Sequence, residues 1–433
     1  MMTYRNRIMK IWITVILLGI GYSGAGQVPD SLSLPWLQQK ARENYPVLKQ
    51  KDILAKASDI RLQQLSDTWL PKLDMNGQAS YQSDVTELGI STAFFKPPVI
   101  DKDIERLNLN VSQVIYDGKQ VSTQKAIEQA NLQLDQQNVE IQLYQIREKI
   151  NLLFFAYAFY EENDKILLKF QEDLSLKLKN AESGVAHGVL LESEADVIRA
   201  ELVKMEQRII ELDDERQNAL DMLSQWTGQN LSLSRHAGMP KADIGGAAGI
   251  KSIRPELVGF ELQQSRLEAN KNLVSTKNIP KLAAFGEAGY GKPGYNMFHD
   301  GFDTYYMLGA KLSWSMWDWH QARKEKDILD FQKEIVSTQS EAFELNTKVA
   351  AIKQISEVQK YRDLMQKDDR IIGLREKISH SAAAQLENGV ITSTDYLIEL
   401  NQEIQARMSK ETHRLQEVKA RVDFLTIQGI NIQ

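Results

Sequence analysis

The spacing of hydrophobic and polar positions changes between Pro71 and Asp117 from a helical period to strict alternation. Apolar residues occupy every second position in two segments: Leu73, Met75, Gly77, Ala79 and Tyr81, then Leu107, Leu109, Val111 and Ile115. A period of two is the spacing of a β-strand whose two faces differ in polarity. The pattern therefore predicts two strands, each with one apolar and one polar face.

The same alternation recurs in the second half of the chain. Its apolar positions are Leu282, Ala284, Ala288 and Tyr290, then Leu308, Ala310, Leu312, Trp314 and Met316. All four segments have about the 9–11 residues of a tilted transmembrane β-strand. Aromatic residues lie at or near their ends: Tyr81, Tyr116, Tyr290, Tyr305, Trp314, Trp317 and Trp319. One hairpin alone would favour a half-buried soluble sheet, but four segments favour apolar faces toward lipid and polar faces toward a lumen.

Two long stretches, residues 118–187 and 319–387, contain no proline and are rich in Glu, Lys, Gln, Leu and Ala. This composition predicts helices of about 100 Å at 1.5 Å per residue. One heptad seam runs through Val139, Leu143, Ile146, Ile150, Leu153, Tyr157 and Tyr160. Such a seam fits a helix packed between neighbours in a ring, and equally a helix in the core of a bundle.

Short motifs show that the chain is an internal duplication. Pro-Lys-Leu follows an apolar residue at Pro71 and again at Pro280, an offset of 209 residues. An aromatic-Asp pair ends at Asp117 and at Asp318, and the offset is now 201 residues. Gly-Val pairs at residues 188–189 and 389–390 keep this second offset. A single deletion in a variable loop explains the change of offset.

Each repeat is predicted to run helix, two strands, long helix, turn and helix. The predicted organisation is a first repeat at residues 27–236, a Gly-rich linker at 237–250 and a second repeat at 251–433. Residues 1–26 have the layout of a secretory signal peptide, with basic residues, a short apolar core and small residues. The mature chain is therefore expected beyond the inner membrane.

Composition excludes several classes of function. The formal net charge is −6 and no basic patch offsets it, which argues against nucleic acid as a partner. The mean hydropathy of −0.38 excludes a polytopic helical membrane protein. There is no cysteine, and the six histidines form no pair with ligand spacing. We therefore expect no catalytic site, no metal and no cofactor, so the protein is predicted not to be an enzyme.

Four strands cannot close a membrane barrel by themselves. Sheet edges exposed to lipid leave backbone N–H and C=O groups without partners, and known barrels need about 8 strands or more. The chain must therefore form oligomers if its strands enter a bilayer. Two or three copies would supply 8 or 12 strands, and the alternation alone does not choose between them.

In the order and duplication of these motifs, the chain resembles the TolC-like outer-membrane efflux proteins over nearly its whole mature length. The resemblance implies a mainly α fold with a small β part. Long antiparallel helices would form an α-barrel, and each chain of a homotrimer would add four strands to a transmembrane β-barrel. It also implies a passive conduit from the periplasm to the exterior, set in outer-membrane lipid of a Gram-negative bacterium. The partners would be a periplasmic adaptor and an inner-membrane transporter, for efflux or type I secretion.

The resemblance places the periplasmic aperture at the helix-hairpin turns, which carry Gly188 and Gly389. Acidic residues that follow these turns are the candidate aperture residues: Asp395, Glu399, Glu194 and Glu192. A carboxylate ring in a narrow pore attracts cations. An acid in the first turn also caps a helix, and Thr392 to Asp395 is a good helix start. Ile398 stands where the family often has a second acid, so the gating details are open.

A structural role is the main alternative. A secreted periplasmic coiled-coil scaffold or adaptor without a pore would share the export signal and the helices. It would not need alternating apolar faces in all four strand segments. The sequence does not identify the cargo of a channel.

Overall fold

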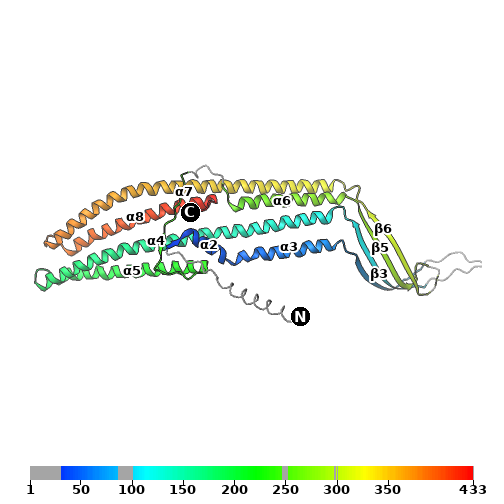
Figure 1. Cartoon of the computed structure of the whole chain (residues 1–433), viewed down its shortest axis with the longest axis horizontal. Helices are drawn as coiled ribbons and strands as arrows, with labels where there is room; N and C mark the ends of the chain where they lie inside the picture. The colour runs from blue at the N-terminus through cyan, green and yellow to red at the C-terminus, as the bar shows by residue number, and fades with distance from the viewer. Residues whose placement is uncertain (1–30, 86–100, 246–251, 297–298, 300, 433) are drawn as a thin grey trace, which may run out of the picture.

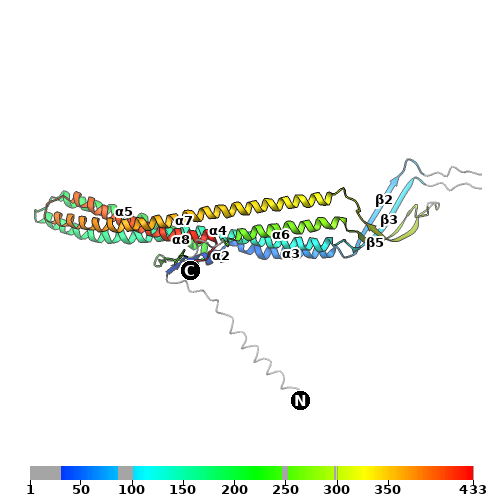
Figure 2. The same ribbon diagram turned by 90° about the horizontal axis from the view of Figure 1, so that it is seen from above.

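The computed structural model describes residues 31–85, 101–245, 252–296, 299 and 301–432. The predicted signal peptide, residues 1–26, lies outside them. A rod of long helices carries a sheet at one end and two helix-hairpin turns at the other (Figure 1). Turning the molecule by 90° shows the sheet leaving the same end of the rod (Figure 2).

The elements follow the predicted order in both halves of the chain. The first half contains α2 (Leu34–Asn44), η2 (Pro46–Lys49), α3 (Gln50–Asp67), β2 (Lys72–Tyr81), β3 (Asp103–Tyr116), α4 (Gln120–Ala186) and α5 (Glu192–Thr227). The second contains α6 (Pro255–Ser275), η4 (Thr276–Asn278), β5 (Lys281–Lys292), β6 (Asp303–Ser313), α7 (Gln321–Glu387) and α8 (Ser393–Gln428). The long helices α4 and α7 have 67 residues each, which confirms the prediction. Both return through helices of 36 residues, α5 and α8.

Two strands were not predicted. β1 (Ser31–Ser33) pairs in parallel with β4 (His236–Gly238), where the expected linker begins. The buried carboxylate of Glu161 on α4 accepts a hydrogen bond from the Ala237 N–H at 2.9 Å. These contacts attach both segments to the middle of the helical rod.

The four longer strands form one antiparallel sheet in the order β2-β3-β5-β6. Its register aligns the apolar positions, because Leu73 lies opposite Val111, Val111 opposite Gly286 and Gly286 opposite Leu308. One face of the sheet is therefore apolar across all four strands. Within the described chain, the outer edges of β2 and β6 pair with no other strand.

At the helix end of the sheet, β3 contains a bulge that the alternation did not show, and β6 ends earlier than the alternation predicted. A register shift between Val114 and Tyr116 takes Ile115 out of the pairing and ends the alternation there. Trp314 and Met316 continue the alternating pattern in the sequence, but they lie beyond the last residue of β6, Ser313. The alternation of apolar and polar residues therefore extends further along the sequence than the ladder of hydrogen bonds.

Two hydrophobic cores hold the helices together. The first lies at mid-rod, where the predicted seam of α4 is largely buried and packs against α2, α5 and the end of α8. The second lies toward the hairpin turns, where Leu174, Ile198 and Leu400 bring α4, α5 and α8 together. α4 therefore packs against neighbours on several sides.

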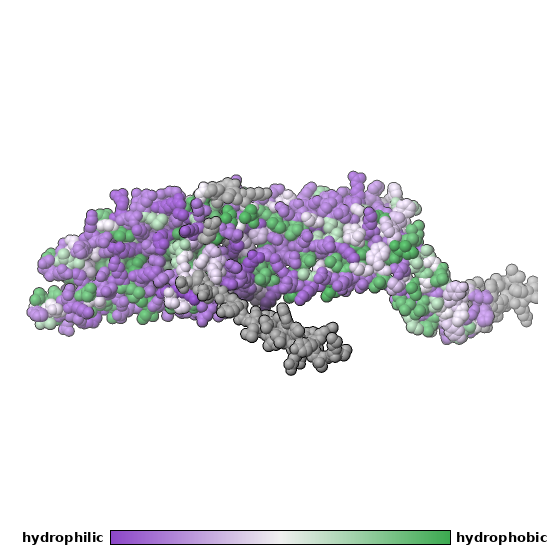
Figure 3. Space-filling model, in the orientation of Figure 1, coloured by the Kyte–Doolittle hydropathy of each residue, from purple (hydrophilic) through white to green (hydrophobic). Residues whose placement is uncertain are grey.

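The surface of the rod is mostly hydrophilic, and hydrophobic residues gather where the sheet begins (Figure 3). On the sheet, the side chains of Leu73, Met75, Leu308 and Leu312 are all more than 60% exposed. Among the described residues, no helix combines the length and the apolar character needed to cross a membrane.

Candidate functional site

The helix-hairpin turns lie together at the end of the rod opposite the sheet (Figure 1). Gly188 and Gly389 have φ angles of 71° and 67°, in the left-handed region that favours glycine. Val189, Leu191 and Val390 are at least 70% exposed in these turns. The duplicated Gly-Val motif thus ends a long helix in each repeat and leaves apolar side chains at the tip.

Asp395 forms a capping box at the start of α8. The Asp395 N–H donates to the Thr392 Oγ1 at 3.2 Å, and the Thr392 N–H donates to the Asp395 carboxylate at 3.1 Å. The Thr392 hydroxyl also donates to this carboxylate at 2.7 Å. These hydrogen bonds lower the pKa of Asp395 below its ordinary value. Asp395 is exposed, so its charge faces solvent while it caps the helix.

Glu194 joins the two hairpins. Its carboxylate accepts a hydrogen bond from the Ser393 N–H, the first residue of α8, at 2.6 Å. A second link runs from Lys177 on α4 to Glu387 at the end of α7, at 2.5 Å. Both contacts cross from the first repeat to the second. The acid predicted as the counterpart of Asp395 therefore lies in a contact between the hairpins.

The other two candidate acids differ in their surroundings. Glu399 pairs with Arg375 at 3.0 Å, which links α8 to α7. Glu192 is exposed in the first turn of α5 and, among the described residues, takes part in no hydrogen bond or ion pair between the hairpins. The four predicted residues therefore share one end of the molecule, but only Asp395 and Glu192 are exposed.

A groove of about 580 Å³ separates the two turns. It is lined by residues from both hairpins, including Lys177, Gly184, His187, Leu190, Asn388 and Ser393. The nearby Tyr396 is buried, and desolvation raises the pKa of its hydroxyl to about 12. This hydroxyl therefore stays protonated at neutral pH, and the charges of the tip come from its carboxylates and basic groups.

The strand–helix junctions explain the duplicated aromatic-Asp motif. The Asp117 carboxylate accepts from the Lys119 N–H at 2.9 Å and the Val121 N–H at 2.6 Å. Asp318 does the same for the N–H groups of His320 and Ala322, at 2.9 and 3.0 Å. Each aspartate supplies acceptors for N–H groups that have no partner within the helix.

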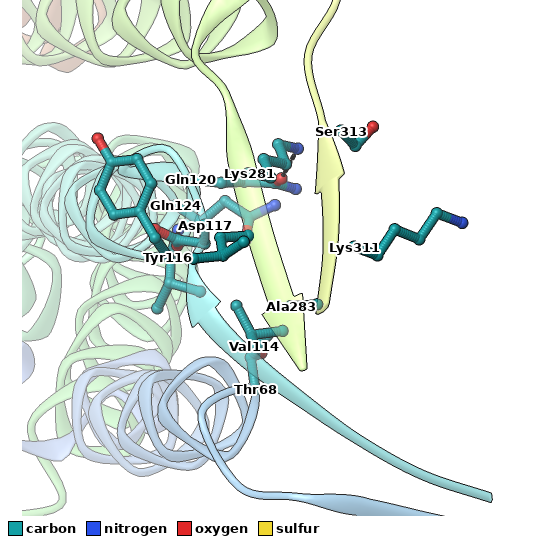
Figure 4. A pocket seen from close by; sticks show the side chains of 12 residues that line it. Thr68, Val114, Tyr116, Asp117, Gln120, Gln124, Lys281, Ala283, Lys311 and Ser313 are labelled. Carbon is teal, nitrogen blue, oxygen red and sulfur yellow. Dashed lines mark hydrogen bonds between the residues drawn. The ribbon is translucent and has the colours of Figure 1, made fainter. Parts of the chain in front are cut away.

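A cavity of about 270 Å³ lies beside the first junction (Figure 4). Gln120 and Lys281 approach each other there, with the Lys281 Nζ donating to the Gln120 Oε1 at 2.5 Å, while Lys311 extends away from them. Pro71 and Pro280 each stand one residue before a strand, β2 and β5. The Pro-Lys-Leu motifs thus mark the points where the helical rod gives way to the sheet.

No group of three His, Cys, Asp or Glu side chains could hold a metal ion in the part of the chain that the structure describes. The contacts between side chains at the hairpin tips were not predicted from the sequence. Lys177 and Arg375 carry no motif, and the helix-start motif that contains Ser393 gives no sign of its contact with Glu194. Only the offset of 201 residues between the turns indicated that the hairpins end together.

Comparison with solved structures gives the fold. The chain is similar to the outer membrane protein VceC from Vibrio cholerae, with a TM-score of 0.66 and 13% identity over 92% of this chain and 96% of that one. It is also similar to the CmeC outer membrane channel of Campylobacter jejuni, with a TM-score of 0.62 and 14% identity over 92% and 85%. The MtrE outer membrane channel of Neisseria gonorrhoeae gives a TM-score of 0.62 and 12% identity over 92% and 89%.

No protein-family model matches the sequence, and no curated protein matches it. At the identities found, the likeness to solved structures establishes the fold and nothing finer. The fold is that of the TolC-like outer-membrane channels, mainly α with a small β part, as the resemblance in the sequence predicted.

Proposed function

We propose that the chain is a subunit of an outer-membrane channel that serves efflux or type I secretion. The observation that carries the proposal is the sheet. Its four strands present one continuous apolar face up to the register shift near Tyr116, and within the described residues its two outer edges pair with no other strand. Such a sheet is suited to a barrel that several copies close in the outer membrane of a Gram-negative bacterium.

We infer that the channel is a homotrimer, with 12 strands from three copies. The helices support association of copies, because α7 carries exposed apolar residues at helical spacing: Ile328, Phe331, Ile335, Leu345, Val349 and Ile352. A stripe of this kind on a long helix fits against a helix of a neighbouring copy. The helices of the three copies would then enclose a periplasmic tunnel that continues the barrel.

The hairpin tips would form the periplasmic aperture and meet a periplasmic adaptor and an inner-membrane transporter. The exposed Val189, Leu191 and Val390 offer apolar contacts to the adaptor. Asp395 and Glu192 provide exposed carboxylates. Glu194 links the two hairpins to each other, and Glu399 links α8 to α7 within the second hairpin. Transport through the conduit would be passive, with energy supplied by the transporter.

Recording of the purified full-length protein in a planar lipid bilayer tests the proposal. The expected result is discrete conductance steps from a protein that requires detergent for extraction. A monomer that stays dissolved without detergent and gives no conductance would refute the channel. That result would favour the periplasmic scaffold instead.

A further inference from the structure

The junction between β6 and α7 exposes an unusual group of side chains, which we call the junction collar: Trp314, Met316, Trp317, Trp319, Arg323 and Lys324. Its three tryptophans and its methionine are 53–75% exposed. The rings of Trp317 and Trp319 contact each other edge to face, with centroids 5.8 Å apart. Within the collar, Trp314 and Met316 continue the alternation of the apolar positions of β6 along the sequence.

The two cations of the collar have no partner in the described part of the chain. Arg323 and Lys324 are exposed, and their side chains form neither an ion pair nor a hydrogen bond there. The two nearest acids are already engaged: the Asp318 carboxylate accepts from backbone N–H groups, and Glu325 pairs with Lys277 at 2.5 Å. Asp327 lies one helical turn further along α7 and forms an ion pair with neither cation in the described structure. The positive charge is therefore available to another molecule.

Local folding does not explain these residue types. Trp319 has a φ of 53°, where a bulky side chain is disfavoured, and the first repeat has Gly118 at the matching position. Cations in the first turn of a helix are disfavoured by its dipole, and the matching residues of the first repeat are Ser122 and Thr123. The second repeat therefore departs twice from the residue types that stabilise such a turn.

We propose that the junction collar binds the headgroup of an anionic phospholipid in the periplasmic leaflet of the outer membrane. The inference rests on the proposed function, since it requires the sheet to enter a bilayer. Tryptophan rings are suited to the headgroup level, and a lysine or arginine close to an anionic surface attracts its phosphates. The adjoining apolar face of β6 indicates a lipid as the source of the phosphate, because free phosphate would gain nothing from that face.

Native mass spectrometry of the full chain in detergent tests the proposal, with phosphatidylglycerol and phosphatidylethanolamine of identical acyl chains at equal concentration. We expect wild-type protein to retain phosphatidylglycerol preferentially. Arg323→Gln together with Lys324→Gln should lower the preference about fivefold for each charge removed. The control, Lys348→Gln together with Lys353→Gln, removes the same charge from exposed positions further along α7 and should keep the preference.

Four outcomes would overturn the inference. Three concern the lipid: equal retention of both lipids by the wild type, an unchanged preference in the Arg323/Lys324 variant, and displacement of the lipid by inorganic phosphate alone. The fourth is dissociation of that variant into single chains with the control intact, which would assign the cations to a contact between copies. If the protein conducts but shows no lipid preference, the lipid site at the junction collar is refuted and the proposed channel is retained. If the protein gives no conductance and is soluble without detergent, both proposals are refuted.

Discussion

The side chain of Asp117 stabilises the turn between strand β3 and helix α4. It is 8% exposed, and its carboxylate accepts from two backbone N–H groups at the start of α4. Gly118 follows with a φ of 68°, and a Cβ there would lie 3.1 Å from the Ile279 Cβ. The duplicated aspartate is thus explained by local hydrogen bonds, which recur at both junctions. The close packing of Gly118 belongs to the first junction, since Trp319 takes its place at the second.

Replacing Asp117 with alanine should lower the free energy of unfolding by about 1 kcal/mol, because the two N–H groups lose their acceptor. The loss is measured by chemical denaturation of the detergent-solubilised protein, followed by helical circular dichroism. Asp117→Asn keeps an acceptor oxygen and should lose less. Equal stability of the alanine variant and the wild type would contradict the capping role.

Asp395 should contribute to cation selectivity if the tips form the aperture. Asp395→Asn is expected to shift the reversal potential in a salt gradient toward weaker cation preference. The control is Asp59→Asn, at an exposed aspartate on α3 far from the tip. Unchanged selectivity in the Asp395 variant would remove this residue from the aperture.

The pKa of Asp395 gives this selectivity a pH dependence. Hydrogen bonds from Thr392 lower that pKa in the folded protein, so the carboxylate keeps its charge as the pH falls past the ordinary aspartate value of about 3.9. The capping contribution to stability is present above the unfolded pKa and is lost as the pH falls through the folded one. Thr392→Val should therefore make selectivity decline at a higher pH than in the wild type.

The residue types of the tip were predictable, but their partners were not. An acid three residues after Thr392 is a local signal for a helix start, and the structure has that capping box. The bond from the Ser393 N–H to Glu194 joins residues 199 positions apart. Such a contact depends on how two hairpins lie side by side, which no local pattern contains.

At the scale of the elements, substitutions on the two faces of β6 test whether the sheet meets lipid. Leu308 belongs to the apolar face and is 78% exposed, whereas Met307 points to the opposite face. Leu308→Arg should destabilise the membrane-inserted protein by about 2–4 kcal/mol if this position lies near the bilayer midplane. Met307→Arg is the matched control and should be tolerated on the lumen side.

The free energy of unfolding of both β6 variants is measured by chemical denaturation of protein inserted in lipid vesicles. A similar small effect of the two substitutions would show that neither face meets lipid, and would support a soluble hairpin. Because the two substituted residues are neighbours in one strand, a difference between their effects on stability reports contact with lipid and not a general disturbance of the sheet.

The two hairpins should separate more readily when Glu194 is changed. Glu194→Ala removes the acceptor of the Ser393 N–H, so we expect a larger mean conductance from more frequent opening at the tip. Glu192→Ala, in the same turn but without a contact between the hairpins, serves as the control. Identical conductance of the two variants would exclude Glu194 as a restraint on the aperture.

The ends of the long helices were predicted more closely than the ends of the strands. The long helices α4 and α7 begin and end within two residues of the predicted limits, because Gly and the aromatic-Asp motifs mark their ends clearly. β6 ends earlier than predicted, since the alternation of residue types does not itself fix where the hydrogen bonds of the strand end. β1 and β4 have three residues each, too few to show a period.

At the scale of the whole molecule, a closed trimer should bring the outer edge of β2 in one chain beside the outer edge of β6 in the next. Because the chain contains no cysteine, introduced cysteines report only on the chosen positions. Single cysteines along β2, each combined with one cysteine on β6, should cross-link into dimers and trimers and no larger species. Bonds formed only within one chain, or a ladder that continues beyond three copies, would contradict a closed trimer.

The equal lengths of the two hairpins have a consequence for symmetry. α4 matches α7 in length and α5 matches α8, so both turns reach the same end of the rod. In the proposed trimer, three chains would place six similar turns around one ring, alternating between the two repeats. A partner protein with sixfold symmetry could then contact all six turns in nearly the same way. The sequence differences between the two repeats would still distinguish each turn from its neighbours in the ring.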